Sequence, residues 1–257
     1  GGDVPFLAVD CVSSGGGQEI SLSNFTLTAT RPAFTYGVVS AAAPGSHFNL
    51  SVDLDMYPMK LPWTRRVDTI HQVSPETLEP SLDGMDWIYQ GKLSEELELQ
   101  VDAHTSTVSF ADHAAPSHNE PFRSFGLQVG NGVVLRHMLE FTRPKLDSVV
   151  LLSCNNVTIS DVTIHSSPGM GVLAHDCTNV ALHRVHNVPQ FPHFPLAGNA
   201  DAIHLASCRG EVVVNGCVCN RQGDDGLNIH SQLAIVQHIE ETLESGGFRL
   251  RVGPNAN

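Results

Sequence analysis

The chain has 257 residues, of which 41% are hydrophobic and 16% are charged, which is enough apolar material for one large domain or two smaller ones. Lys and Arg number 14 against 27 Asp and Glu, so the formal net charge is −13. This charge argues against nucleic-acid binding, because a phosphate-binding surface needs a basic excess. No apolar run reaches the roughly 20 residues of a membrane helix, and the composition is not that of a disordered chain.

The chain begins with two glycines and shows neither an initiator Met nor a signal-peptide pattern, so we expect it to be a piece of a longer protein. Its 6 cysteines are too sparse for a disulfide scaffold and do not form a repeated zinc pair. We expect no metal ion and no organic cofactor.

The first 32 residues contain "GQEISLSNFTLTA", which is typical of one strand pair of a stacked coil. From residue 33 to 135 the alternating segments become longer, as in "FTYGVVSAA", "HFNLSVDLD", "EELELQVDA" and "STVSFAD", and turn-rich stretches separate them. This pattern predicts an inserted antiparallel β domain, barrel-like in form. We expect the chain to return to the coil near "GVVLRHMLEF".

Residues 136–232 contain four similar segments, which are "DSVVLLSC" from Asp147, "MGVLAHDC" from Met170, "DAIHLASC" from Asp201 and "DGLNIHSQ" from Asp225. Their starts are 23, 31 and 24 residues apart. A period of 23–24 residues built from short strands and turns, without helical spacing, fits stacked coils better than a helical solenoid. The repeat therefore predicts an all-β protein, a right-handed parallel β-helix.

Three columns of this alignment hold apolar residues or cysteines, which stacked strands would bury. The columns are Val149, Val172, Ile203 and Leu227; Leu151, Ala174, Leu205 and Ile229; and Cys154, Cys177 and Cys208. Coils stacked in this register lie about 4.8 Å apart.

The 31-residue step is explained if about eight residues leave the coil as a loop. The segment "NVPQFPHFPLAG" at 187–198 is that loop, because its three prolines cannot donate to a strand ladder. It ends shortly before Asp201, so we expect Phe191 and Phe194 to help form a wall of a sugar pocket. The tail 233–257 includes "GGFRLRVG" and predicts the start of a second β insertion.

Three aspartates stand where two of the repeated strands begin. Asp201 and Asp225 are equivalent positions, so their backbones should lie about 4.8 Å apart, with Asp224 beside them. Carboxylates held so closely repel one another, which raises at least one pKa. Glycoside hydrolysis uses such a set, because one protonated carboxyl donates to the leaving oxygen while ionised carboxylates activate water. Turn residues and a Ca²⁺ site remain alternatives.

Two polar residues lie on the same strands as these aspartates. His204 and Asn228 stack on the polar side and are candidate sugar-binding residues, although an exposed His is often only a solvated one. Asp147 shares the aspartate column two coils away, roughly 10 Å off, and is expected to be a turn residue.

The alternation of strand residues also carries a stereochemical expectation. Asp224 should face away from Asp201 and Asp225, with the carboxyl groups about 6.5–9.5 Å apart, as in inverting glycosidases. Asp224 should then carry the raised pKa and act as the general acid.

These motifs resemble two groups of β-helix hydrolases. The spacing of the aspartates is similar to the three-aspartate arrangement of polygalacturonases. The closer resemblance is to family 110 glycoside hydrolases, the α-1,3-galactosidases, in "NFTLTATRPAFTYGVV", "NNVTISDVTIHSSPGMGVLAHDC", "NADAIHLASC" and "GDDGLNIHS". It covers most of the chain and is strongest in 145–231. It implies that Asp201 and Asp225 activate water, that Asp224 is the acid, and that the substrate is a galactose-terminated oligosaccharide or polysaccharide.

Polygalacturonases are expected to carry Gly-His-Gly and Arg-x-Lys shortly after the paired aspartates, and residues 226–257 contain neither. A net charge of −13 also favours a neutral sugar over an anionic uronide. Three alternatives to a galactosidase remain, which are a polygalacturonase-like pectin hydrolase, a non-catalytic carbohydrate-binding β-helix and a structural solenoid. An extracellular or periplasmic location is expected for the hydrolase.

Overall fold

The protein is represented by a computed structural model in which every regular element among the described residues is a β-strand, as the sequence predicts. No helix in this part of the chain has the length and hydropathy needed to cross a membrane. The structure describes residues 7–11, 19–29, 32–43, 47–57, 67–79, 89–90, 99–102, 107–111, 127–137, 147–231, 235–242 and 248–253.

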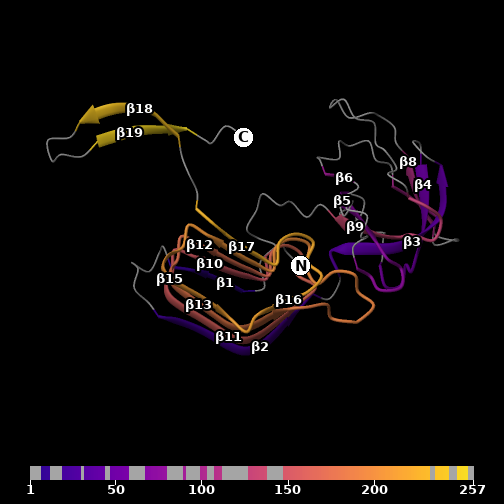
Figure 1. The fold of residues 1–257 in the computed structure, drawn as a ribbon, viewed down its shortest axis with the longest axis horizontal. Helices are drawn as coiled ribbons and strands as arrows, with labels where there is room; N and C mark the ends of the chain where they lie inside the picture. Colours follow the sequence, from indigo (N-terminus) through magenta and orange to yellow (C-terminus); the bar gives the residue numbers. More distant parts are fainter. Residues whose placement is uncertain are drawn as a thin grey trace.

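One parallel sheet contains the repeated strands found in the sequence (Figure 1). Val172 pairs with Val149 on one side and with Ile203 on the other, and Ile203 pairs in turn with Leu227. The predicted column is therefore confirmed as one continuous ladder. The strands follow in the order β1 (Leu7–Asp10), β10 (Val149–Leu152), β12 (Val172–His175), β14 (Ile203–Ala206) and β17 (Leu227–His230).

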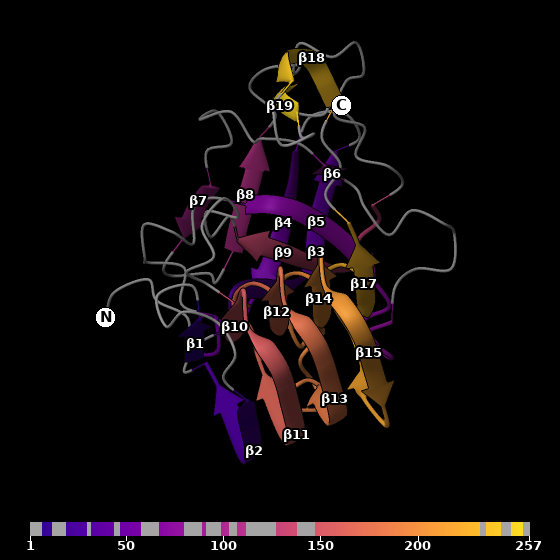
Figure 2. The ribbon, with the colours of Figure 1, turned by 90° about the vertical axis from the view of Figure 1, so that its left-hand side faces the viewer.

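A second parallel sheet is formed by the strands that alternate with these along the chain. Figure 2 shows β2, β11, β13 and β15 side by side, in the order in which they pair. Each passage of the chain from one strand of the first sheet to the next adds a strand to the second, which is compatible with a parallel β-helix. The members are β2 (Ile20–Thr28), β11 (Asn155–His165), β13 (Thr178–Asn187), β15 (Arg209–Asn215) and β16 (Val218–Cys219).

Inward side chains of both sheets form one core. Leu151, Ile159 and Leu182 are fully buried in it, and burying such a side chain contributes about 1.5–3 kcal/mol relative to leaving it exposed. Leu227 and Ile229, the last members of two apolar columns, were predicted to be buried. This prediction was wrong, since Leu227 is 45% and Ile229 57% exposed. The reason is that β17 is the final strand of its sheet, so no described strand covers it.

The cysteine column is buried or half-buried as expected, but one of its members is oxidised. Cys154 forms a disulfide with Cys11, which follows β1, across a sequence separation of 143 residues. Its neighbours in the column, Cys177 and Cys208, are free. The sparse cysteine spacing carried no signal for this pairing, because Cys11 lies outside the four aligned segments.

Replacing Cys11 by Ala is expected to lower the free energy of unfolding by about 2–5 kcal/mol, because the disulfide restricts the unfolded chain across a long loop. Urea unfolding with and without reductant measures this. Cys208→Ala, which removes a free half-buried thiol, is the control and should cost less. Equal stability of the wild type and Cys11→Ala under oxidising conditions would contradict the prediction.

An antiparallel sheet lies in the sequence between β2 and β10, where the insertion was predicted. Its strands pair in the order β6, β5, β9, β3, β4, β8 and β7, and all of these pairs are antiparallel. The strands are β3 (Phe34–Ala43), β4 (His47–Val52), β5 (Val67–Val73), β6 (Tyr89–Gln90), β7 (Leu99–Asp102), β8 (Thr107–Ala111) and β9 (Gly132–His137). Closure into a barrel and the boundaries 33 and 135 stay predictions.

The return to the coil was expected near Gly132, but β9 still belongs to the antiparallel sheet, between β3 and β5. Parallel strands resume at Val149. All residues of β9 are buried, and a continuous apolar run does not tell the two kinds of sheet apart. In the tail, β18 (Ile235–Thr242) and β19 (Phe248–Gly253) form an antiparallel pair.

The proline-rich segment leaves the parallel sheets between β13 and β14, as predicted, although Asn187 still ends β13 and Gly198 already forms parallel bridges with Ser167 and Gln222. Phe194 and Leu196 pack into the core of the antiparallel sheet, where Phe194 lies edge-on against Phe34 at 5.7 Å between ring centroids. Phe194 is therefore a core residue of the insertion, whereas Phe191 is exposed. The loop therefore connects the parallel sheets with the core of the antiparallel sheet.

Candidate active site

The three predicted aspartates lie together where β14 and β17 begin. One side-chain oxygen of each lies within 4.8 Å of the others. Asp201 is buried, while Asp224 and Asp225 are exposed. The backbone N–H of Asp225 donates to Oδ1 of Asp201 at 3.2 Å, which ties the two coils together at this point.

The expectation that Asp224 faces away from the other two aspartates does not agree with this geometry. Its carboxyl group lies within 4.8 Å of theirs, which is closer than the expected 6.5–9.5 Å. Strand alternation does not apply here, because Gly223 to Gly226 form a bend and β17 begins only at Leu227.

The two candidate sugar-binding residues are hydrogen-bonded to the aspartates. Nδ1 of His204 lies 2.6 Å from Oδ2 of Asp201, and Nδ2 of Asn228 donates to Oδ2 of Asp225 at 3.2 Å. An ionised carboxylate only accepts, so Nδ1 of His204 carries the proton when Asp201 is charged. Both residues orient carboxylates, and their contact with sugar stays a prediction.

His230 also belongs to this network. Its Nε2 lies 2.9 Å from Nε2 of His204, with the two rings at 84°. With Nδ1 of a neutral His204 protonated, Nε2 of His204 accepts and His230 donates. The register of the aligned segments could have indicated this contact, because His230 pairs with Ala206 on the strand that carries His204.

Asp224 carries a raised pKa, in the direction expected from the sequence. Partial burial is the largest cause, and repulsion from Asp201 and then Asp225 adds to it. The positive charge of Arg136 and the backbone N–H of Asp225 act in the opposite direction. Desolvation rather than repulsion is thus the main reason why the Asp224 carboxyl retains its proton more readily.

Asp147, the other member of the aspartate column, has a backbone role. Its Oδ1 accepts a hydrogen bond from the N–H of Met170 at 2.7 Å. Burial raises its pKa, while this hydrogen bond lowers it. Asp147 thus joins two successive coils, and no described carboxylate cluster includes it.

Arg136 of β9 is a residue at this site that sequence reasoning missed. Its side chain is buried, and its Nη1 donates to the carbonyl oxygens of Asn199 and Gly223, at 2.7 Å each. Asn199 lies two residues before Asp201, and Gly223 lies directly before Asp224. No sequence signal was available, because Arg136 lies 63 and 87 positions from its partners.

The Asn199 side chain completes the connection between the insertion and the coil. Its Nδ2 donates to the carbonyl of Ala33 at 2.8 Å and to that of His137 at 3.4 Å. Ala33 directly precedes β3 and His137 is the last residue of β9, and these two strands are neighbours in the antiparallel sheet. The backbone of Gly223 passes so close that an added Cβ would lie 2.5 Å from the Asn199 carbonyl oxygen. Glycine is therefore required at this bend.

The carboxylates of Asp201, Asp224 and Asp225 are also the described groups that could hold a metal ion. Ca²⁺ takes six to eight oxygen ligands. Both oxygens of Asp201 already bond the Asp225 N–H and the His204 ring. Fewer lone pairs of Asp201 therefore remain for a cation.

No family model matches the chain. It is 28% identical over 147 residues to α-1,3-galactosidase A of Bacteroides fragilis, which covers 55% of the chain and 24% of the relative. It is 32% identical over 88 residues to α-1,3-galactosidase A of Shewanella woodyi, covering 34% of the chain and 14% of the relative. It is 30% identical over 96 residues to α-1,3-galactosidase B of Phocaeicola vulgatus, covering 36% and 16%. The expected resemblance is confirmed, and the match spans a quarter or less of these relatives' length.

Proposed function

From this relationship to the α-1,3-galactosidases, we propose that the chain carries the catalytic carboxylates of an α-galactosidase that removes terminal α-1,3-linked galactose. The observation that carries the proposal is the cluster of Asp201, Asp224 and Asp225, with oxygens within 4.8 Å of one another. The raised pKa of Asp224 supports its role as the proton donor.

Each carboxylate has a separate task in the proposed reaction. Asp224 gives its proton to the glycosidic oxygen as the bond from that oxygen to the anomeric carbon breaks. Asp201 and Asp225 hold one water molecule, which adds to the anomeric carbon while its proton passes to this pair. His204 and Asn228 orient the pair and bond hydroxyl groups of the sugar.

We favour inversion because of how Asp201 is held. A retaining enzyme needs a carboxylate free to form a covalent bond to the sugar. Asp201 is buried with one oxygen bonded to the Asp225 N–H and the other to His204, which suits a fixed base for water. The separation of the carboxyl groups does not support inversion, so the proposal depends on this hydrogen bonding.

The fold and the location of the protein follow as further parts of the proposal. Two parallel sheets that gain a strand in each coil support a right-handed parallel β-helix, since parallel crossovers are right-handed in nearly all proteins. The disulfide between Cys11 and Cys154 supports an extracellular or periplasmic location, where disulfides persist.

The full-length protein incubated with an α-1,3-galactosyl oligosaccharide should release galactose, and proton NMR should detect the β-anomer first. If the α-anomer formed first, the inverting assignment would be overturned, but the proposed hydrolase activity would still stand. Release of reducing ends from polygalacturonate, with no galactose from the oligosaccharide, would favour the pectin hydrolase. Binding without any hydrolysis would favour the non-catalytic alternative.

A further inference from the structure

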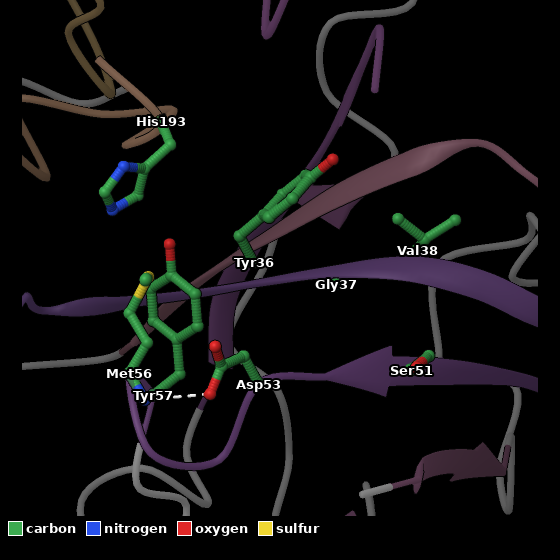
Figure 3. Close-up of a pocket in the computed structure, with 8 residues that line it drawn as sticks. All are labelled: Tyr36, Gly37, Val38, Ser51, Asp53, Met56, Tyr57 and His193. Atoms are coloured by element: carbon green, nitrogen blue, oxygen red, sulfur yellow. Dashed lines mark hydrogen bonds between the residues drawn. The ribbon is translucent and has the colours of Figure 1, made fainter. Parts of the chain in front are cut away.

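A cavity of about 350 Å³ lies between the antiparallel sheet and the proline-rich loop, and it shares no residue with the aspartate cluster (Figure 3). This volume is within the range of small-molecule sites. The cavity is lined by Tyr36 and Gly37 of β3, by Tyr57 of the turn that follows β4, and by His193 of the loop.

Tyr57 supplies an unexplained polar group in this cavity. The residue is only 3% exposed, and its hydroxyl makes no hydrogen bond to any described residue. Figure 3 shows this hydroxyl pointing toward His193. Burial raises the pKa of Tyr57 far above its usual range, so the hydroxyl stays protonated. A buried hydroxyl without a partner costs free energy, and a ligand group would remove that cost.

Asp53 adds an acceptor at the same cavity. Its Oδ1 accepts from the N–H groups of Asp55 and Met56, at 3.0 and 3.1 Å. Its other carboxylate oxygen makes no hydrogen bond to a described residue and remains available. Tyr36 also lines the cavity, and its hydroxyl points away from His193 (Figure 3). The eight lining residues include no Lys or Arg.

We propose that this cavity is a second carbohydrate site, which binds a neutral pyranose residue of the glycan away from the aspartate cluster. A pyranose presents C–H groups that pack on an aromatic ring, as at Tyr36, and hydroxyls that bond groups such as the Tyr57 hydroxyl and Asp53. A neutral sugar fits better than an anionic one, because Asp53 is an acidic lining group and the eight lining residues include no Lys or Arg. The choice of a sugar rests on the proposed function.

Tyr57→Phe tests the site in the full-length protein that also carries Asp224→Asn, which is expected to slow turnover of the oligosaccharide. Calorimetry with an α-1,3-galactosyl oligosaccharide should find two binding sites in the Asp224→Asn reference. The Tyr57→Phe change should weaken one of them at least tenfold. It should leave the melting temperature of the free protein unchanged or raised, because the hydroxyl it removes has no described partner. Tyr36→Phe, the matched control, should change affinity less than twofold.

The proposal would be overturned if Tyr57→Phe weakened no binding site, whether the reference shows one site or two. Affinity that falls steeply with added salt would also overturn it, because that result indicates a charged ligand. A failure of the galactosidase proposal shows itself separately, as the absence of galactose release by the unmodified protein. Binding at the second site is measured whether or not that release occurs.

Discussion

Asp224→Asn should lower kcat/KM by about 10²–10⁴-fold for galactosides with poor leaving groups, while substrates with activated leaving groups should be affected far less. A poor leaving group needs the proton that Asp224 supplies, whereas a nitrophenolate departs without it. Asn at Asp201 or Asp225 should damage both substrate classes alike, because water attack is needed in either case. Steady-state kinetics on a nitrophenyl galactoside and an α-1,3-linked disaccharide measures these effects.

The pH profile provides an independent check of the same assignment. A general acid works only while protonated, so the rate on the disaccharide should fall as the pH rises through the raised pKa of Asp224. The residual rate of Asp224→Asn on the disaccharide should lack this alkaline limb. Asp147→Asn is the matched control, since its amide oxygen still accepts from Met170 and the leaving-group dependence should not change. Equal losses on both substrates in Asp224→Asn would reject the acid role.

Arg136→Met is expected to lower the free energy of unfolding by about 3 kcal/mol or more, because two hydrogen bonds from a charged donor are lost at once. The carbonyls of Asn199 and Gly223, each 2.7 Å from Nη1, are left without this donor. Urea unfolding measures the loss. Arg184→Met, which removes an exposed ion pair with Asp161, is the control and should cost much less.

The same variant separates a positioning role of Arg136 from simple stabilisation. Its positive charge lowers the pKa of Asp224, so Arg136→Met should move the alkaline limb of the pH profile to higher pH. Arg136→Lys keeps the charge and should restore that limb even where stability is not fully regained. An alkaline limb that stays in place in Arg136→Met would limit Arg136 to a structural role.

The repeat was predictable because stacking imposes local rules. A strand that adds to a parallel sheet repeats the same alternation, so Val149, Val172, Ile203 and Leu227 could be aligned from letters alone. That alignment also placed Asp201 beside Asp225. Burial at Leu227 could not be predicted, because it depends on which strand lies at the end of the sheet.

Only the part of the candidate site that lies on the paired strands could be predicted from the sequence. Asp224 lies in a bend, and the period of a strand carries no information about the direction of a side chain there. β9 could not be assigned to a sheet, because its residues are all buried and do not alternate. The disulfide partner of Cys154 is Cys11, which directly follows β1 and lies far outside the four aligned segments.

The sequence by itself determined the all-β architecture, the register of the stacked strands and the meeting of Asp201 with Asp225, because each depends on contacts that recur every 23–24 residues. Only the tertiary structure decided that Asp224 turns toward that pair. It also decided that hydrogen bonds from Arg136 and Asn199 connect the antiparallel sheet to the segments that carry the aspartates. The physical reason is that these groups meet at isolated contacts, in a bend or between distant segments, and such contacts impose no periodic pattern on the chain.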